Sequence, residues 1–389
     1  MRVVVQKYGG SSLARPEFIN RVAERVIKAK EKGYEVVVVV SALGETTDQL
    51  IELSRQITKS PPRRELDMLL SVGERVSISL LAMAITAKGY PAISFTGSQV
   101  GILEIKGNRI RKELQDGKIV VVAGFQGVSI EKEITTLGRG GSDTTAVALA
   151  AALNAERCEI MTDVDGVYTA NPQVVHSAQR ISEITYEEML DMADLGAQVL
   201  KASAVEFAKR HNIKIYIGSS FTGYIGTIIT DGSLDKKRVT GVAVDEDVVL
   251  ISLNHATKEP CFKIIKSLAE EGVAVKFIWK NGPGCSFILK EEDLETAKNI
   301  IESNKTNMAK GRVSFNQKVG LLSVVGVGIN FGTDVMAKTM KIFEAMSLFP
   351  EAYNFSETRL SFAIEKQHLK QAASRIHDTL IIQSNYEKV

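Results

Sequence analysis

The chain has 389 residues, of which 44% are hydrophobic and 24% are charged, a composition typical of a globular protein long enough for two or three domains. Its 48 basic residues nearly balance its 46 acidic ones, so no basic footprint indicates nucleic acid or an anionic membrane surface as a partner. Small-molecule chemistry is the better expectation. The absence of a signal-peptide core and of any run of ~20 apolar residues predicts a cytoplasmic protein.

The cysteines and histidines indicate no metal or disulfide chemistry. Cys158, Cys261 and Cys285 are an odd number at wide spacings without a CxxC pair, which predicts free, buried thiols. None of the five histidines has the paired spacing of a metal site, so we predict no metal-ligating residues.

Up to about residue 230, short β-branched runs alternate with stretches of helical spacing. The apolar runs are VVVQKY (3–8), VVVVV (36–40), AISFT (92–96), IVVVAGF (119–125), EIMTDV (159–164) and IKIYIG (213–218). Strands this uniformly apolar are buried on both faces, as in a parallel sheet covered by helices. We therefore expect one α/β domain over residues 1–230 with a largely parallel central sheet.

The region from 231 to 389 is predicted to hold two copies of one smaller unit. A shift of 75 residues places Ser286 and Phe287 on Ser361 and Phe362, and a repeat of this kind indicates a duplicated fold. Each copy reads strand, helix, strand, strand, helix, which is typical of a ferredoxin-like βαββαβ unit. We place the two units at about 247–310 and 315–389.

A glycine-rich turn directly follows the first predicted strand. The stretch KYGGSS (7–12) places Gly9, Gly10 and Ser11 where backbone N–H groups can approach an anion, and Lys7 adds a positive charge for phosphate oxygens. The lysine precedes the glycines, which excludes a P-loop, and GxGxxG is absent. An ordinary Gly-Gly turn is the alternative.

A second glycine-rich loop, TTLGRGGSDTT (135–145), leads into the apolar helix AVALAAAL. Ser142 or Asp143 can cap that helix, and Arg139 offers a planar fork for a carboxylate or phosphate. Capping alone leaves the arginine and three glycines unexplained. Anion binding is therefore favoured over a plain turn.

Three further polar stretches follow predicted strands or lie near them. SALGETTD (41–48) carries Ser41 and Thr47, SVGERVS (71–77) carries Glu74, and TDVDGVYTANPQ (162–173) carries Tyr168. Because the carboxyl ends of parallel strands meet at one edge of a sheet, these side chains can face one cleft. Taken alone, Glu74 would be a solvated helix charge and the last stretch a plain loop of turn formers.

These motifs, in this order, resemble the aspartokinases of the amino-acid kinase family. ITYEEMLDMADLGAQVL (184–200), VEFAKR (205–210) and a tail similar to paired ACT regulatory units extend the resemblance over the chain. It implies a three-layer sandwich followed by two ACT units. It also implies ATP-dependent phosphorylation of the β-carboxylate of L-aspartate to 4-phospho-L-aspartate, with Mg²⁺ accompanying ATP, as the entry step to lysine, threonine and methionine synthesis.

The resemblance assigns roles residue by residue. Lys7 is similar to the lysine that neutralises the transferring phosphoryl group, and Asp143 to the aspartate that orients it. Within the acceptor set, Arg139 would bind a substrate carboxylate and Glu74 the ammonium. The full acceptor set is Ser41, Thr47, Glu74, Arg139 and Ser142. The implied ATP contacts are Lys7, Gly9, Gly10, Ser11, Thr162, Asp163, Tyr168, Gln173 and Gln198.

The chain departs from the family pattern at the nucleotide side. Gln173, after Asn171-Pro172, stands where the family usually has arginine, and Gln198 stands where it has lysine. Each lost exposed charge is worth ~1 kcal/mol. Either ATP binds weakly or another cation such as Lys201 compensates. The segment 98–118 is also shorter than usual.

Other interpretations stay open at this point. A kinase for a related amino acid would fit the shortened segment, and a catalytically weak sensor would fit the two glutamines. The turns HATKEPCF (255–262) and GINFGTDVM (328–336) lack the usual ACT effector pattern. The tail is therefore expected either to bind an amino-acid effector or to serve as a dimerisation module, and a homodimer is expected in both cases.

Overall fold

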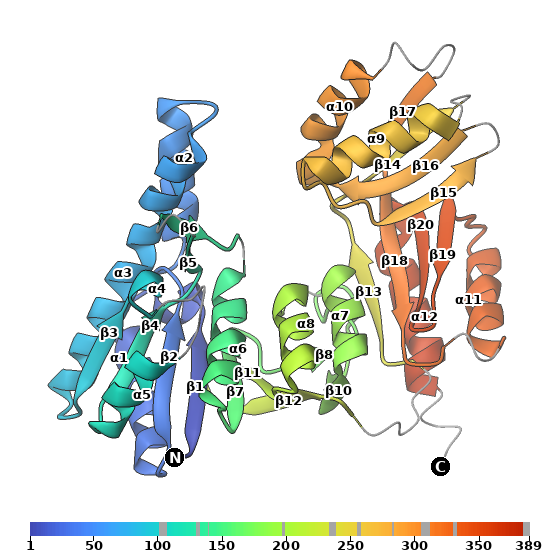
Figure 1. Ribbon diagram of the computed structural model, residues 1–389. Coiled ribbons are helices and arrows are strands. Elements are labelled where there is room, and N and C mark those ends of the chain that lie inside the picture. The colour runs from blue at the N-terminus through green and yellow to red at the C-terminus, as the bar shows by residue number, and fades with distance from the viewer. Residues whose placement is uncertain are drawn as a thin grey trace. The chain divides into compact units, whose positions relative to one another are not determined.

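The computed structural model describes residues 1–100, 107–129, 133–138, 140–196, 199–232, 239–254, 258–281, 284–304, 312–329 and 333–383. The chain divides into two compact units (Figure 1). The first unit comprises Met1–Tyr168, Gln179–Asp194 and Gln198–Lys236. The second comprises Thr169–Ala178, Leu195–Ala197 and Lys237–Val389. Predicted residues Arg139 and Gln198 lie outside the described residues.

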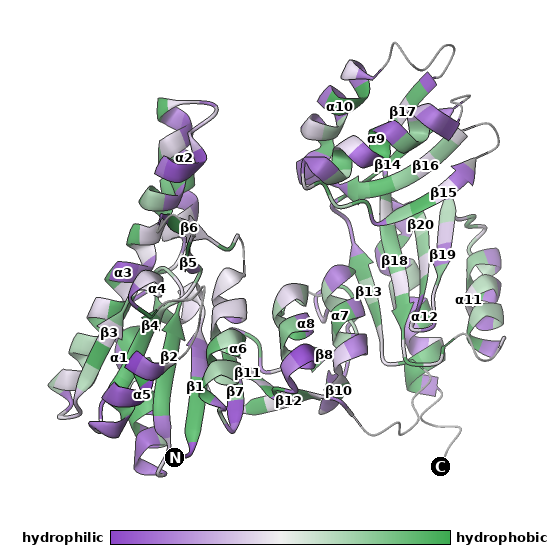
Figure 2. Cartoon of the chain, viewed as in Figure 1, coloured by the Kyte–Doolittle hydropathy of each residue, from purple (hydrophilic) through white to green (hydrophobic). Residues whose placement is uncertain are grey.

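The first unit is built on an eight-stranded sheet in the order β10-β12-β11-β7-β1-β2-β4-β3. The strands are β1 (Val3–Tyr8), β2 (Glu35–Val40), β3 (Ala92–Phe95), β4 (Ile119–Ala123), β7 (Arg157–Thr162), β10 (Glu183–Thr185), β11 (Ile215–Ser219) and β12 (Ile225–Thr230). All pairings are parallel except that of β11 with β12. The largely parallel sheet expected from the apolar runs is confirmed, and in Figure 2 strand β2 is mostly green, whereas β1 carries a purple stretch.

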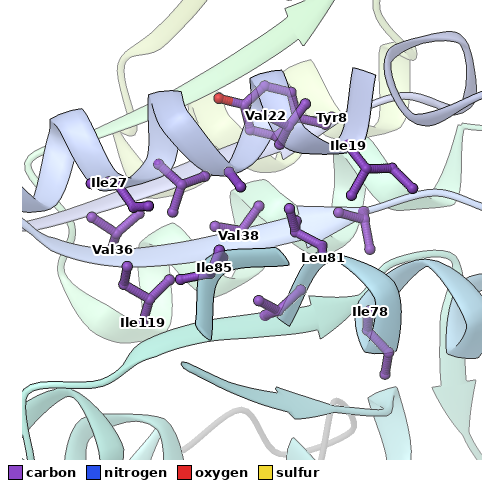
Figure 3. Close-up of a cluster of buried hydrophobic side chains, with 14 of the residues drawn as sticks. Tyr8, Ile19, Val22, Ile27, Val36, Val38, Ile78, Leu81, Ile85 and Ile119 are labelled. Atoms are coloured by element: carbon purple, nitrogen blue, oxygen red, sulfur yellow. The ribbon is translucent and has the colours of Figure 1, made fainter. Parts of the chain in front are cut away.

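Helices cover both faces of this sheet because alternate residues of each strand point to opposite sides. On one face, Val36 and Val38 of β2 pack with α1 (Pro16–Glu31) and α3 (Arg63–Ala87), as Figure 3 shows. Helix α6 (Gly141–Leu153) contacts β1, β2 and β7. The remaining elements of this unit are η1 (Gly10–Leu13), α2 (Thr46–Ile57), α4 (Gly97–Val100), α5 (Asn108–Gln115), α7 (Tyr186–Asp194), α8 (Ala202–His211) and the hairpins β5 (Gln126–Val128) with β6 (Ile134–Thr136) and β8 (Val167–Tyr168) with β9 (Arg180–Ile181).

Helix α3 is the one described helix with the length and composition of a membrane span. A helix that covers a protein core meets the same criteria. Its residues Ile78, Leu81 and Ile85 belong to the buried cluster of the first unit, which is the packing of a core helix.

The second unit contains two four-stranded antiparallel sheets, ordered β13-β18-β20-β19 and β15-β16-β14-β17. Its elements are β13 (Gly241–Asp245), β14 (Val248–Asn254), α9 (Lys258–Glu270), β15 (Phe277–Asn281), β16 (Gly284–Lys290), η3 (Glu291–Asp293), α10 (Leu294–Ser303), β17 (Arg312–Asn316), β18 (Val319–Val325), α11 (Asp334–Ala345), β19 (Ala352–Phe355), β20 (Arg359–Glu365), η5 (Lys366–His368), α12 (Leu369–His377) and the π-helical turn η6 (Asp378–Ile382). Elements β14 to β17 form one complete βαββαβ unit, as predicted.

The second ferredoxin-like copy, which contains β18 to β20, takes its fourth strand, β13, from the chain segment that precedes the first copy. Strand β13 pairs with β18, so the copy spanning β14 to β17 is nested in sequence within the other. A serine pair marks the same position in both sheets: Ser286 donates to the half-buried Ser252 at 2.9 Å, and the hydroxyls of the buried Ser323 and Ser361 lie 2.8 Å apart. Ser286 and Ser361, which the 75-residue shift aligns, thus occupy equivalent cross-strand positions.

Candidate active site

A buried ion pair lies between β1 and the start of α6. Lys7 Nζ is 2.7 Å from Asp143 Oδ1, and the two side chains are only 12% and 8% exposed. Asp143 stands in the first turn of α6, where the helix dipole favours a negative charge. A carboxylate fixed in this way holds the lysine ammonium in one position, which is the geometry that an orienting role for Asp143 requires.

The turn after β1 is tightly packed against the turn after β2. A Cβ on Gly10 would lie 2.6 Å from the carbonyl oxygen of Gly44 and 2.8 Å from that of Ala42, so only glycine fits. Gly44 N donates to Gly10 O at 3.0 Å. Gly9 lies beside the Lys7 ammonium, since a Cβ there would be 3.6 Å from Nζ. The backbone of this turn and the lysine charge are therefore adjacent.

Two predicted acceptor residues meet across the sheet edge. Ser41 follows β2, Ser142 lies in the first turn of α6, and Ser41 Oγ donates to Ser142 Oγ at 3.0 Å. Since Asp143 is the next residue in α6, this hydroxyl pair lies close to the Lys7–Asp143 ion pair. Thr47 lies in the first turn of α2 and is half-buried.

Glu74 is a buried carboxylate on α3. It is 2% exposed, its Oε1 accepts a hydrogen bond from Ala42 N at 3.2 Å, and its Oε2 has no hydrogen-bond partner among the described residues. Burial raises the pKa of Glu74 to about 7. An unpartnered buried carboxylate oxygen is costly unless a cation pairs with it, so Glu74 fits a substrate ammonium better than the solvated charge considered above.

Lys201 lies directly against the glycine-rich loop that precedes α6. Gly140 has a φ of +76°, and a Cβ there would come within 1.8 Å of Lys201 Cγ. Lys201 is the residue before α8 and is exposed. The structure therefore places a cation next to the loop at the position that the sequence suggested as a compensation for Gln198.

The predicted nucleotide contacts of the first unit are polar and largely paired with near neighbours. Thr162 donates to Asp163 at 2.9 Å, and the Tyr168 hydroxyl donates to Asp165 at 2.8 Å. The hydrogen bond from Tyr168 is the largest influence that lowers the pKa of Asp165. Arg180 donates to the other oxygen of Asp165 at 2.8 Å.

Arg180 was not singled out from the sequence. It also donates to the Tyr224 hydroxyl at 3.0 Å and stacks over that ring with its guanidinium carbon 4.6 Å from the centroid. No motif surrounds it, and its proximity to Tyr168 comes from the β8–β9 pairing. The one sequence feature that could have indicated Arg180 is that it follows the TDVDGVYTANPQ stretch along the chain.

Gln173 and the other predicted nucleotide contacts of the described residues belong to different compact units. Gln173 belongs to Thr169–Ala178, which is part of the second unit, whereas Thr162, Asp163 and Tyr168 are part of the first. Its backbone N–H donates to Asn171 Oδ1 at 2.9 Å, a local turn typical of asparagine.

Two buried hydroxyls near strand ends were also missed. Ser12 Oγ and Ser220 Oγ have no hydrogen-bond partner among the described residues. Ser12 lies in η1, and Ser220 follows β11, with its backbone N–H donating to Thr162 O at 2.7 Å. Unpaired buried hydroxyls next to the glycine turn and the Thr162 strand end suit a polar ligand such as a nucleotide phosphate or sugar.

Comparison with known proteins identifies the family of the chain. Residues 2–219 match the amino acid kinase family. The aspartokinase of Bacillus sp. (strain MGA3) is 42% identical over 399 residues, covering 97% of each chain, and that of Mycolicibacterium smegmatis is 40% identical over 414 residues, covering all of this chain and 98% of its own. The fold is similar to that of E. coli aspartokinase III in complex with aspartate and ADP, at a TM-score of 0.85 and 23% identity, covering 97% of this chain and 100% of that one. The chain therefore belongs to the amino acid kinase family and, within it, to the aspartokinases.

Proposed function

We propose that this protein catalyses the ATP-dependent phosphorylation of the β-carboxylate of L-aspartate to 4-phospho-L-aspartate. The observation that carries the proposal is the buried Lys7–Asp143 pair beside the tightly packed Gly9-Gly10 turn. The full-length similarity to aspartokinases supports aspartate as the acceptor.

The reaction requires electrostatic stabilisation of the transferring phosphoryl group and does not require a general base. A carboxylate is already ionised at neutral pH, so an oxygen of the acceptor attacks the γ-phosphorus, the bond to the ADP oxygen breaks, and no proton is removed. The enzyme must hold two anions in line and spread the charge that develops between them. Lys7, held by Asp143, supplies a fixed positive charge for this purpose.

The acceptor would be held by residues from three elements. Glu74 on α3 would pair with the ammonium, and its unpartnered Oε2 is the feature that supports this role. Arg139 would bind a carboxylate with its planar fork. Ser41, Ser142 and Thr47 would supply hydroxyl contacts.

The nucleotide would be held by the glycine turn and by the loop after β7. Gly9, Gly10 and Ser11 would contact the phosphates, because glycines let backbone N–H groups approach an anion closely, and Gly9 lies beside the Lys7 ammonium. Thr162, Asp163 and Tyr168 would contact the nucleoside, and Gln173 and Gln198 stay part of the proposal. Bound Mg²⁺ would neutralise phosphate charge. No three metal-ligating side chains cluster in the described part of the chain.

The second unit is proposed to bind an amino-acid effector and to join two copies of the chain. Its two ferredoxin-like sheets support this proposal, since units of this kind can pair edge to edge, and the resemblance to paired ACT units implies a regulatory role. We place the enzyme in the cytoplasm, as the sequence predicts.

A coupled assay of ATP consumption with purified protein tests the function. We expect turnover with L-aspartate and Mg-ATP, a rate at least about tenfold lower with glutamate, because one methylene is worth that much in a fitted site, and no turnover with asparagine, which has no β-carboxylate to accept the phosphoryl group. Comparable rates with glutamate would favour the related-acceptor alternative. No turnover together with no ATP binding by calorimetry would favour the sensor alternative.

A further inference from the structure

The hairpin that carries Tyr168 opens into a loop that belongs to the second unit. Strands β8 and β9 are antiparallel, with Tyr168 opposite Arg180. The residues between them, Thr169–Ala178, are here called the strap, and they cluster with the second unit. Since Tyr168 and Arg180 are cross-strand partners, the strap leaves and returns at one place, next to the Asp165–Tyr168–Arg180 contacts.

The strap is anchored in the second unit as a core segment. Ala170 and Val175 are 3% and 1% exposed and lie in the same buried cluster as Val242 and Ile376. Thr169 O accepts a hydrogen bond from Val242 N of β13 at 2.7 Å. A loop that only connected β8 to β9 would run over the surface, so this burial requires another explanation.

One buried histidine, His377 at the end of α12, holds both ends of the strap. It is fully buried, its Nε2 lies 2.8 Å from Thr169 Oγ1, and its Nδ1 lies 3.2 Å from Ser177 Oγ. Ser177 also donates to Asp378 Oδ1. Burial lowers the pKa of His377, which keeps the ring neutral at pH 7.

The hydrogen bonds around His377 determine which of its ring nitrogens carries the proton. Ser177 has one hydroxyl proton, which it gives to Asp378, so toward His377 it can only accept. The ring proton is therefore on Nδ1, and Nε2 accepts from the Thr169 hydroxyl. Neither an apolar residue nor a side chain with a single polar atom could make both bonds.

We propose that His377 is a positioning residue for the nucleotide: by clamping Thr169 and Ser177, it ties the Tyr168 hairpin to the second unit and sets the place of Tyr168 for ATP. This inference rests on the proposed function, in which Tyr168 contacts the nucleotide. It makes α12 and η6 the part of the second unit through which a change in that unit would reach ATP binding.

The test compares variants on the strap and on the helix in the full-length protein. Loss of one buried hydrogen bond shifts an equilibrium roughly two- to tenfold. Thr169→Val and Ser177→Ala should each raise the KM and the calorimetric Kd for ATP by about that factor, with the KM for aspartate within about twofold of wild type. His377→Ala should have a larger effect than either, and His377→Asn, whose amide can still donate to Ser177, should recover part of it.

A matched control separates positioning from simple loss of stability. Ser361→Ala removes a buried hydroxyl from the Ser323–Ser361 pair in the same unit, away from the strap. It should lower the Tm about as much as Ser177→Ala and leave both KM values unchanged. If Ser177→Ala and Ser361→Ala lower the Tm alike and neither changes the ATP constants, the inference is wrong. It is also wrong if the strap variants change the constants for aspartate and ATP equally.

The wild-type protein distinguishes this failure from a failure of the proposed function. If wild type binds ATP and forms acyl phosphate while the strap variants behave like the control, only the role of His377 is refuted. If wild type neither binds ATP nor turns over, the proposed function has failed, and the inference falls with it.

Discussion

The proposed acceptor end and the proposed nucleotide end of the site are built in different ways. At the acceptor end, together with the Lys7 ammonium proposed to contact the transferring phosphoryl group, buried or half-buried groups hold one another in place: Lys7 pairs with Asp143, and Ser41 with Ser142. At the nucleotide end, the side chains are more exposed and pair with neighbours in the same or an adjacent loop, as Tyr168 does with Asp165. The first arrangement is preorganised within the first unit, and the second depends on a hairpin whose loop is anchored in the second unit.

This difference indicates which contacts regulation could change without disturbing the charges that act on the transferring group. Fixed charges for the transferring group gain most from burial, because electrostatic effects are larger in a low dielectric. A nucleotide contact on a hairpin tied to another unit can instead shift without disturbing those charges. We therefore expect substitutions at the acceptor end to affect kcat and aspartate, and substitutions at the nucleotide end to affect ATP.

The largest effect should come from breaking the Lys7–Asp143 pair. Lys7→Met and Asp143→Asn should each lower kcat by about 10²- to 10³-fold, the usual range for one preorganised electrostatic group. Because the two act as a unit, the double variant should be little worse than either single variant. Steady-state kinetics with circular dichroism as a folding control measures this, and fully multiplicative losses would show that Asp143 does not act through Lys7.

The second largest effect is expected from replacing Arg139, and it should be confined to the KM for aspartate. Loss of a charged hydrogen bond of ~1.5–3 kcal/mol corresponds to a rise of about 10- to 150-fold in the KM for aspartate on Arg139→Ala, with little change for ATP. Measuring both constants on one preparation tests the assignment. Equal effects on the two substrates would contradict it.

Glu74 predicts a pH dependence that is specific to aspartate. With a pKa of about 7, Glu74 loses its charge as the pH falls below 7, so the KM for aspartate should rise up to about tenfold per unit of pH. Glu74→Gln should raise this KM at pH 8 and make it nearly constant between pH 6 and 8. A profile that Glu74→Gln leaves unchanged would assign the titration to another group.

The same shift has a consequence for stability with a definite sign. The pKa of Glu74 is raised in the folded state from its ordinary value of 4.5, so between these values the folded chain holds a proton that the unfolded chain has lost. The contribution of protonated Glu74 to the free energy of unfolding is therefore fully present below pH 4.5 and is lost as the pH rises through 7. The difference in unfolding free energy between Glu74→Gln and wild type should change over this window.

The smallest effect is expected at Lys201, and it sharpens the comparison at the nucleotide end. Lys201→Met keeps the stem that covers Gly140 and removes the charge, so the KM for ATP should rise about fivefold at low salt, as for one partly exposed charge. High salt should shrink the difference. Lys209→Met on the same helix, where Lys209 pairs with Glu187 at 2.7 Å, is the matched control and should leave the KM unchanged. If the rise in the KM for ATP were independent of salt, the effect of Lys201→Met would come from altered packing against Gly140 and not from the lost charge.

Much of this architecture follows from local sequence. Uniformly apolar runs such as VVVVV predict buried parallel strands, and all six predicted runs of the first unit are strands. The repeat predicts two similar units, yet not their nesting, because β13 is a short apolar strand like many others and its partner β18 is distant in sequence. The glycine turns predict anion-binding loops because the backbone constraint is local.

The contacts that sequence reasoning missed are those made by residues far apart in the chain. His377 shows no metal-like spacing, and nothing in its neighbourhood indicates that Thr169 and Ser177 hold both of its ring nitrogens. Glu74 looks like a solvated helix charge until α3 is packed on the sheet. In each case the role depends on burial, which a single sequence predicts poorly for polar residues.

The central claim is that the acceptor end directs phosphoryl transfer to the β-carboxylate of aspartate. It is tested most directly by incubating the purified chain with L-aspartate and Mg-ATP, trapping the product with hydroxylamine and identifying the hydroxamate by mass spectrometry. We predict β-aspartyl hydroxamate, formed in proportion to ADP and about 10²- to 10³-fold more slowly with Lys7→Met. The α-hydroxamate, or ADP release without any hydroxamate, would contradict the account.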